Sequence, residues 1–306
     1  MIEPAGRLET IVRSGAFCVT AEIVPPRSAD GDAIFRQARE LVGYADAVNV
    51  TDNPAANAHM SPLAGVAAAA RAGIEPTLQL TTRDRNRVAI TSDLLGAWAL
   101  GARNLLCLSG DPIGRGDHPD ASEVRDLSVL DLVRLAADLR AEGRLGSGAE
   151  VDPAARFFVG VADSPLVPAY DPARLEAKLD AGAAFVQTQI VYDVDAFTAW
   201  ADVVRGRGIH QRAALIAGVA PLRTERQARY MNEHLPGVAV PERVVAELRS
   251  AGPEAHEVGV RIAIGVVRAL AAIPGIAGVH LMGLGREGSV RHVVERAGLL
   301  PRPAAG

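Results

Sequence analysis

The sequence predicts a single-domain α/β protein built as a (β/α)8 TIM barrel. Eight apolar, strand-like runs alternate with helical segments along the 306 residues, which is the order that places parallel strands inside a ring of helices. No linker of different composition divides the chain. We therefore assign residues 1–300 to the barrel and the proline-rich residues 301–306 to a frayed tail. A doubly wound open sheet is the alternative with the same alternation.

The strands are predicted from short runs of aliphatic and β-branched residues that end at turn-forming residues. Pro25-Pro26 closes the first run, and Gly110-Asp111-Pro112 ends the fourth, because these sequences continue neither a strand nor a helix. In chain order the runs are Phe17–Val24, Ala47–Thr51, Glu75–Thr82, Leu105–Pro112, Phe157–Ala162, Ala184–Val191, Ala213–Val219 and Gly278–Gly283.

The helices between these runs are predicted from longer segments with recognisable ends. Gly101 ends one helix, Pro236-Gly237 interrupts another, and the Gly- and Asp-rich loop 112–126 is expected to be mobile or to face a ligand. The predicted helices are Asp30–Tyr44, Pro62–Ala72, Asn86–Leu100, Ser128–Glu142, Pro172–Ala181, Asp195–Arg205, two or three pieces within Thr224–Ala272, and Ser289–Ala297.

Composition favours a soluble cytoplasmic protein that binds small molecules. The formal charge is −4 with acidic and basic residues interspersed, which argues against nucleic acid or an anionic membrane as the main partner. No apolar run approaches the roughly 20 residues that cross a bilayer, and Met1–Leu8 lacks the apolar core of a signal peptide. The two cysteines, Cys18 and Cys107, lie in apolar runs and are expected to be buried free thiols.

Polar residues recur on one face of the predicted strands. Because side chains alternate along a strand, the aliphatic set packs on the helices and the polar set points into the barrel, where leaving it unpartnered would cost on the order of 1–3 kcal/mol per group. We therefore expect a polar pocket that binds a ligand with many hydrogen-bonding edges. The inward set is Thr20, Glu22, Asn49, Thr51, Thr77, Gln79, Thr81, Cys107, Ser109, Asp111, Gln187 and Gln189.

Two carboxylates and one amide in this set are candidates for chemistry. Glu22 and Asp111 come at strand ends, where a partly dry pocket can separate two carboxyl pKa values, so that one donates a proton and the other stays charged. Two solvated loop acids are the alternative. Gln189 is suited to a flat heteroaromatic edge, with Gln187 behind it, although a core amide network would use the same residues.

Two further patterns carry less weight. Gly283–Gly288 matches G-x-G-x-x-G, but it lies too near the C-terminus for a dinucleotide-binding βαβ unit. In a barrel, this loop could touch a phosphate or leave Arg286 free to clamp a carboxylate. Asp117, His118 and Asp120 share one flexible loop with Asp111 without ligand spacing, so we expect a solvated acidic loop and no metal.

Six ordered motifs resemble the methylenetetrahydrofolate reductase family, and the resemblance covers nearly the whole chain. The Arg-Asp-Arg-Asn block is similar to the branch often fused to a homocysteine methyltransferase domain, which is not present here. The motifs are Thr20–Arg27 (with Glu-x-x-Pro-Pro-Arg), Val48–Thr51, Leu80–Asn86, Leu108–Pro112, Lys178–Ala183 and Thr188-Gln189.

The resemblance implies a flavin-dependent oxidoreductase of one-carbon metabolism and methionine biosynthesis. NADH or NADPH would reduce FAD, and the flavin would reduce 5,10-methylenetetrahydrofolate to 5-methyltetrahydrofolate in a ping-pong sequence. By motif, Glu22 would be the acid that opens the folate ring to the 5-iminium cation, and Asp111 would support that cation and tune the flavin. Gln189 would contact the pterin and the nicotinamide in turn, and Arg286 would lie on the substrate side. A homo-oligomer is also expected.

The resemblance also implies a set of cofactor positions, with the only lysine of the chain at the FAD diphosphate. Those positions are Thr51, Gln79, Leu108, Ser109, Gly110, Asp111, Ala162, Asp171 and Lys178.

Four positions depart from the family pattern. Gln79 replaces a flavin-contacting histidine, Ser164 a tyrosine, Ala177 an arginine, and Glu225 the phenylalanine that stacks on substrate. These changes leave open a reductase of a reduced pterin with weakly bound or absent flavin or with another electron donor. A non-catalytic folate-binding subunit that serves an electron-transfer partner is the alternative from a different class.

Overall fold

The strands of the computed structural model, which describes residues 3–304, form one closed parallel barrel. Each strand pairs with its sequence neighbours, and β8 pairs with β1 to complete the ring. The predicted (β/α)8 TIM barrel is therefore confirmed. The strands are β1 (Cys18–Ile23), β2 (Ala47–Val50), β3 (Pro76–Thr81), β4 (Asn104–Leu108), β5 (Phe158–Asp163), β6 (Phe185–Ile190), β7 (Ala214–Val219) and β8 (Ile276–Met282).

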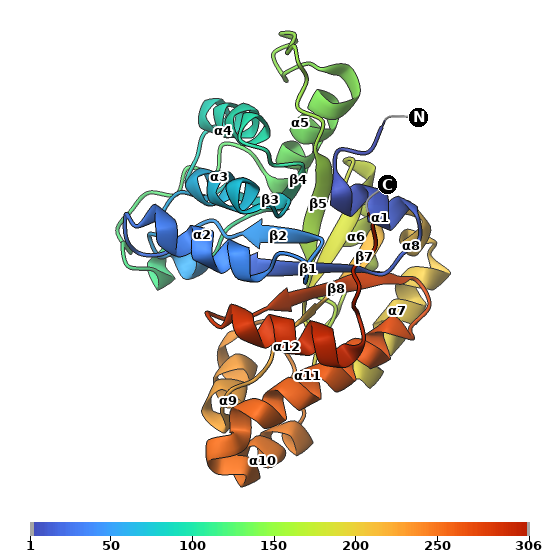
Figure 1. The fold of residues 1–306 in the computed structure, drawn as a ribbon. Coiled ribbons are helices and arrows are strands. Elements are labelled where there is room, and N and C mark those ends of the chain that lie inside the picture. Colours follow the sequence, from blue (N-terminus) through green and yellow to red (C-terminus); the bar gives the residue numbers. More distant parts are fainter. Residues whose placement is uncertain (1–2, 305–306) are drawn as a thin grey trace.

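The helices lie outside the strands, as Figure 1 shows for α2 and α3 beside β1 and β2, and for α11 and α12 beside β8. They are α1 (Arg7–Arg13), α2 (Gly31–Glu40), α3 (Pro62–Ala72), α4 (Arg87–Ala99), α5 (Val129–Glu142), α6 (Pro172–Asp180), α7 (Val194–Gly206), α8 (Ile209–Arg212), α9 (Glu225–His234), α10 (Glu242–Ala251), α11 (Ala255–Ala271) and α12 (Glu287–Ala297). Short 3-10 turns, η1 (Pro54–Ala56), η2 (Ile113–Arg115) and η3 (Gly252–Glu254), lie in loops.

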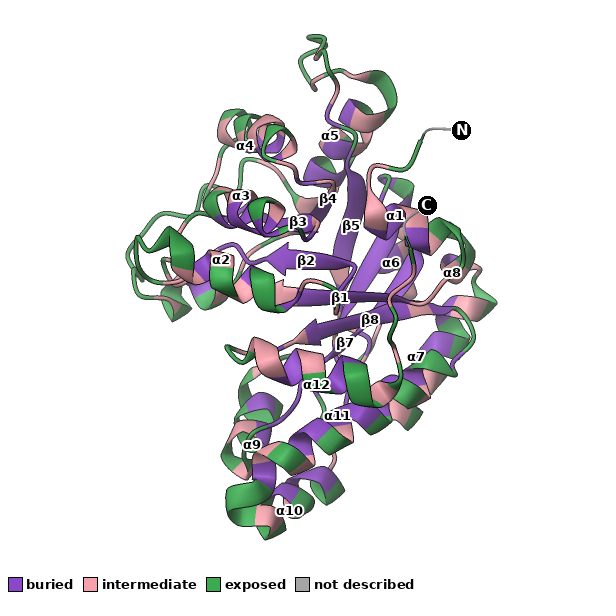
Figure 2. Cartoon of the chain, in the orientation of Figure 1, coloured by how far each residue is buried: buried purple, intermediate pink, exposed green. Residues whose placement is uncertain are grey.

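The N-terminal lead, for which the sequence predicts no element, contains α1. Its Leu8 and Ile11 are buried in a cluster with Phe158 and Phe185 from the interior of the barrel, so this helix covers the N-terminal end of the strands. Figure 2 shows the strands as almost entirely buried. Gly160 is required beside this cluster, because a Cβ there would overlap the Phe185 ring.

The fourth strand faces the opposite way from the prediction. The sequence predicts Cys107, Ser109 and Asp111 on the interior face and Leu106 and Leu108 outside. In the structure Leu106 and Leu108 line the interior cavity, while Cys107 packs in the core between strands and helices. Alternation defines two faces but not which one is inside. From Leu105 to Leu108 both faces of β4 are apolar or carry a thiol, and Ser109 and Asp111 lie beyond the strand end.

Both cysteines are free and buried, as predicted. Burial raises the pKa of Cys18 to about 12, with the neighbouring Asp46 carboxylate adding to the shift. Burial also raises the pKa of the Cys107 thiol well above its ordinary value. Both side chains therefore remain thiols at neutral pH.

A second hydrophobic cluster extends the barrel beyond β7. Met231 of α9 and Leu248 of α10 are buried there with Tyr192 and Leu222 from the loops after β6 and β7. In Figure 1 these two helices lie at the end of the molecule remote from α4 and α5. They confirm that several helical pieces fill Thr224–Ala272.

The C-terminal residues are anchored at Arg302, within the stretch expected to fray. Its guanidinium lies 2.5 Å from Asp46 Oδ2 and donates to the Phe17 carbonyl at 2.7 Å. The Asp46 side chain is fully buried, accepts from the Val19 amide, and also pairs with Arg7. Residues 305 and 306 of the expected tail lie outside the described residues.

We expect Arg302→Ala to lower the free energy of unfolding by about 3 kcal/mol, because removing one partner of a buried pair leaves Asp46 undercompensated. Urea unfolding measures the change. Arg212→Ala is the control, since Arg212 pairs with the exposed Asp180, and exposed pairs contribute about 1 kcal/mol or less. Equal effects of the two substitutions would contradict the anchoring.

Candidate active site

A cavity of about 170 Å³ opens at the C-terminal ends of the strands, where (β/α)8 barrels hold their active sites. Its lining combines carboxylate, amide, hydroxyl and imidazole groups with an apolar wall. The lining residues are Glu22, Gln79, Leu106, Leu108, Ala162, Asp163, Ser164, Gln187, Thr188, Gln189, His280 and Met282.

Glu22 is held in this cavity by two neighbours. The side chain projects from β1, is 18% exposed, and accepts a hydrogen bond from Gln79 Nε2 at 3.2 Å. His280 Nε2, from the adjacent β8, lies 3.7 Å from the same oxygen, Oε2. A carboxyl group in this setting is partly removed from water and faces the open volume, which suits a proton donor.

Beneath Glu22 lies a buried polar layer. Asn49 Nδ2 donates to Gln187 Oε1 at 2.6 Å, and Gln187 Nε2 donates to Thr20 Oγ1 at 3.2 Å. Thr20 Oγ1 lies 2.9 Å from His280 Nδ1. The predicted polar interior is therefore real on β1, β2 and β6, and Gln187 belongs to a core amide network. The sequence signal that could have identified His280 is its inward position on the last strand.

Gln189 lies at the rim and lines the same cavity. Its Nε2 donates to the Pro236 carbonyl at 3.4 Å, and its Oε1 accepts from the Ile190 amide at 3.0 Å. The side-chain amide of Gln189 is thus oriented by the loop that contains Pro236 and Gly237 and follows α9. The structure brings Gln189 and Glu22 to one cavity, as the sequence predicts.

Asp111 takes a different place. Its carboxylate is exposed on the loop after β4, outside the cavity lining, and accepts from the Ala55 amide in the loop after β2 at 2.7 Å. Asp117 further along the β4 loop accepts from the Ala58 amide at 3.0 Å. These contacts fasten the two loops together, so loop 112–126 folds against the loop after β2.

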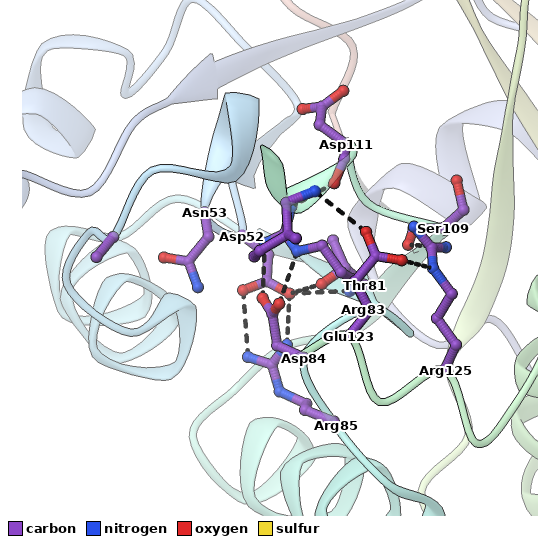
Figure 3. Close-up of polar contacts among 12 residues, drawn as sticks. Asp52, Asn53, Thr81, Arg83, Asp84, Arg85, Ser109, Asp111, Glu123 and Arg125 are labelled. Atoms are coloured by element: carbon purple, nitrogen blue, oxygen red, sulfur yellow. Dashed lines mark hydrogen bonds and ion pairs between the residues drawn. The ribbon is translucent and has the colours of Figure 1, made fainter. Parts of the chain in front are cut away.

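Under these loops lies an ion-pair cluster (Figure 3). The sequence analysis predicts no such cluster. Arg85 binds the fully buried Asp52 side chain at 2.7 Å, and Asp52 also accepts from the Thr81 amide and hydroxyl. Arg83 is almost wholly buried, bonds Asp84 through two nitrogens, and donates to the Asp111 carbonyl at 3.1 Å. The Asp84 hydrogen bond raises the pKa of Arg83. The Arg-Asp-Arg motif therefore fixes the main chain that carries Asp111.

The positions that the resemblance assigns to FAD follow one arc of the rim, from β2 to α6. The Thr51 hydroxyl there is buried without a hydrogen-bond partner among residues 3–304. Gly110 has φ +80°, and a Cβ would lie 2.9 Å from Arg83 Cβ, so glycine is required where the chain passes the Arg83 side chain. Of these two features, the orphaned Thr51 hydroxyl is the one that fits a bound cofactor, because the close approach of Gly110 is to a protein side chain.

The other members of this arc already have protein partners. Lys178 Nζ donates to the Ala162 carbonyl at 2.6 Å and lies 3.6 Å from Asp163 Oδ1, with 24% of its side chain exposed. Asp171 caps α6 by accepting from the Ala173 amide. The Ser109 carbonyl accepts from Arg125. The Lys178 ammonium group therefore already has an acceptor and an acidic neighbour, on a side chain that is partly exposed.

Arg286 lies in a second pocket, of about 340 Å³, after the ends of β7 and β8. Arg223 and His256 line it as well, together with Thr224 and Gln227. Within the described part of the chain, neither arginine forms an ion pair, and His256 Nδ1 is buried without a partner. Two uncompensated guanidinium groups make this pocket suitable for carboxylates.

The four departures from the family pattern are spread over the structure. Ser164 lines the cavity, and Ala177 lies on α6. Glu225 begins α9 and pairs with Arg229 and Arg249 at 2.8 and 2.9 Å. It is engaged at the surface and does not line the cavity.

A larger hollow, about 680 Å³, lies between α4 and α5 on the outside of the barrel. It carries no inward-facing strand residue and includes Val88, which is 73% exposed. We therefore place the chemistry at the strand ends. Among residues 3–304 no cluster of potential metal ligands occurs, and no helix there has the length and hydropathy of a membrane span.

A family model described as methylenetetrahydrofolate reductase matches residues 7–298. The chain belongs to this family. The family match confirms the resemblance that the six ordered motifs indicate, from Thr20–Arg27 to Thr188-Gln189.

The names of individual relatives agree with this family assignment. Methylenetetrahydrofolate reductase 1 of Schizosaccharomyces pombe is 29% identical over 242 residues, which is 74% of this chain and 36% of that protein. A probable methylenetetrahydrofolate reductase (NADPH) of Caenorhabditis elegans is 26% identical over 96% of this chain and 44% of its own length. The chain thus spans less than half the length of these two relatives. The 5,10-methylenetetrahydrofolate reductase of Salmonella typhimurium is 25% identical over 71% of this chain and 68% of its own length.

The fold is also found among solved structures. An uncharacterized protein from Clostridium thermocellum, described as binding two copies of 5-methyl-5,6,7,8-tetrahydrofolic acid, superposes with a TM-score of 0.65 at 12% identity, over 97% of this chain and 99% of its own. At this identity the likeness supports the barrel architecture.

The orphaned Thr51 hydroxyl gives a stability prediction. Thr51→Val should raise the free energy of unfolding by about 1 kcal/mol, because an unpartnered buried hydroxyl is replaced by a methyl group of similar size. Thr81→Val is the matched control: its hydroxyl donates to Asp52 at 2.9 Å, so that substitution should destabilise by about 1–2 kcal/mol. Denaturant unfolding of both variants provides the comparison, and destabilisation by Thr51→Val would show that its hydroxyl has a partner.

Proposed function

We propose that the protein is an oxidoreductase that reduces 5,10-methylenetetrahydrofolate to 5-methyltetrahydrofolate with hydride from NADH or NADPH, through FAD. The observation that carries the proposal is the convergence of Glu22, Gln79 and Gln189 on one cavity at the strand ends, in a chain that matches the family model over residues 7–298. The names of the relatives support the reaction, and the folate bound by the Clostridium thermocellum protein supports the substrate class.

The cavity suits the pterin end of a folate. Gln189 presents an amide at the rim, and amides match the alternating donors and acceptors of a pterin edge. Glu22 then supplies a proton to the amine nitrogen that leaves as the imidazolidine ring of the substrate opens. The bonding electrons stay on that nitrogen, and the cation that results at the other nitrogen is the form ready to accept hydride.

The pocket around Arg286 supports the same substrate. A folate carries carboxylates at the end remote from its pterin, and Arg223 and Arg286 have no ion pair within the described chain. Arg286 follows β8 by four residues, and Met282 at the end of β8 lines the cavity. One folate could therefore place its pterin at Glu22 and its carboxylates at the two guanidinium groups.

The arc from Thr51 to Lys178 would hold FAD, with the Thr51 hydroxyl and the Gly110 main chain near the ring system and Lys178 at the diphosphate. When bound, the flavin would accept hydride from the nicotinamide and pass it to the folate. The protein contributes the positions of these groups and the exclusion of water by Leu106 and Leu108.

A reductase that works without tightly bound flavin is the second candidate. The cavity, about 170 Å³, is smaller than the roughly 300 Å³ at which ligand sites usually begin. Gln79, at the position of a flavin-contacting histidine, is engaged with Glu22. The engagement of Gln79 favours direct use of a nicotinamide or another donor over a resident flavin, whereas the cavity volume limits any ring system bound there.

Spectroscopy and turnover distinguish the two candidates. Purified protein that shows a flavin spectrum, bleached by NADH or NADPH and restored by methylenetetrahydrofolate, supports the first. Turnover of methylenetetrahydrofolate without flavin, before and after incubation with FAD, supports the second. Absence of turnover with either nicotinamide in both conditions contradicts the proposed reaction.

Glu22→Gln should leave reduction of the flavin by NADH within about twofold of the wild type and slow the folate half-reaction by roughly 10²–10⁴-fold, the usual contribution of a general acid. The glutamine keeps the size of the side chain but cannot donate an acidic proton. Stopped-flow measurement of each half-reaction makes the comparison. Equal losses in both would exclude the assigned role.

Lys178→Ala should weaken FAD retention by at least about tenfold, because a charge-assisted hydrogen bond to the cofactor is lost. The free energy of unfolding should fall by about 1–3 kcal/mol, because the Ala162 carbonyl and the buried Asp163 lose the ammonium group. Arg174→Ala is the control, since Arg174 is an exposed cation on the same helix. Equilibrium dialysis against FAD and urea unfolding measure the two effects. Unchanged FAD affinity in the Lys178 variant would remove the lysine from the diphosphate site.

A further inference from the structure

His280 is a buried titratable side chain, and the proposed reaction gives it no role. It projects from β8 into the barrel, is 2% exposed, and lies between the buried polar layer and Glu22. Its two ring nitrogens meet different groups. Nδ1 is 2.9 Å from Thr20 Oγ1 and 3.5 Å from Gln187 Nε2, while Nε2 is 3.7 Å from Glu22 Oε2.

The hydrogen-bond partners determine which ring nitrogen carries the proton. Gln187 Nε2 is a donor, and it donates to Thr20 Oγ1 at 3.2 Å. The Thr20 hydroxyl has a single proton, and the acceptor that the structure offers for it is His280 Nδ1. Nδ1 therefore faces two donors and must be an acceptor, so the imidazole proton resides on Nε2.

This tautomer places an N–H group opposite Glu22. Gln79 Nε2 donates to Glu22 Oε2 at 3.2 Å, and the His280 N–H group faces the same oxygen from 3.7 Å, an electrostatic contact longer than a hydrogen bond. Oε2 is then the acceptor oxygen in either state of the carboxyl group. A proton on Glu22 must reside on Oε1, for which no partner occurs among the described residues.

We propose that His280 is a positioning residue, fixed by Thr20 and Gln187 in the Nε2–H tautomer, that together with Gln79 assigns the transferable proton of Glu22 to Oε1. The role in turnover rests on the proposed function, whereas the tautomer does not. During ring opening the proton leaves Oε1 for the departing amine nitrogen, and the new carboxylate keeps the two N–H groups at Oε2.

The tautomer is measured directly by nitrogen-15 NMR of protein labelled at histidine, with His280→Gln used to assign the His280 signals. We expect a protonated Nε2 and an unprotonated Nδ1. Thr20→Val should shift the Nδ1 signal and mix the tautomers, whereas Thr20→Ser should retain the wild-type pattern. Thr77→Val is the matched control, because Thr77 is equally buried on β3 and its hydroxyl has no partner within residues 3–304. A protonated Nδ1 in the wild type would overturn the assignment, since it requires Gln187 and Asn49 to present the opposite amide faces.

Turnover tests the role. Thr20→Val should lower folate reduction about five- to tenfold, the factor for one net hydrogen bond, with little change in the KM for folate; Thr20→Ser should restore it and Thr77→Val leave it unchanged. Unchanged turnover in Thr20→Val with an altered His280 signal would refute the positioning role. Failure of the wild type to turn over methylenetetrahydrofolate would instead refute the proposed function and leave the tautomer as measured.

Discussion

The closed parallel barrel brings polar side chains from different strands together in its interior, where they must satisfy one another. Thr20, Asn49, Gln187 and His280 come from four strands, and each would leave an unpartnered group in a dry interior if its neighbours were apolar. Their hydrogen bonds form the buried polar layer beneath the cavity. The position of Glu22 depends on this layer, because His280, which belongs to it, and Gln79 are the polar neighbours of the Glu22 carboxyl group.

The rim of the cavity is stabilised by ion pairs. Asp52, Arg83, Asp84 and Arg85 pair with one another beneath the loops after β2, β3 and β4, and the Arg83 guanidinium reaches the main chain of Asp111. Buried charges are tolerated only when they are paired and hydrogen-bonded. This cluster explains why an Arg-Asp-Arg sequence follows β3. It fixes loops that carry candidate cofactor positions, including Gly110, without itself lining the cavity.

The barrel, its eight strands and the inward position of Glu22 and Gln187 could be predicted from the sequence, because alternation on amphipathic strands and the strand–helix order are local signals. The face of β4 could not, because Leu106, Cys107 and Leu108 are apolar on both sides. The place of Asp111 outside the cavity depends on its contact with the Ala55 amide. Such contacts between loops distant in sequence have no local signature.

The central claim is that a folate binds at the strand ends with its pterin beside Glu22 and Gln189. A crystal structure of the protein with 5-methyltetrahydrofolate tests it most directly. The account predicts the pterin edge within hydrogen-bond distance of Glu22 and Gln189, and the folate carboxylates beside Arg223 and Arg286. A folate bound in the groove between α4 and α5, or with its pterin away from Glu22, would contradict the account.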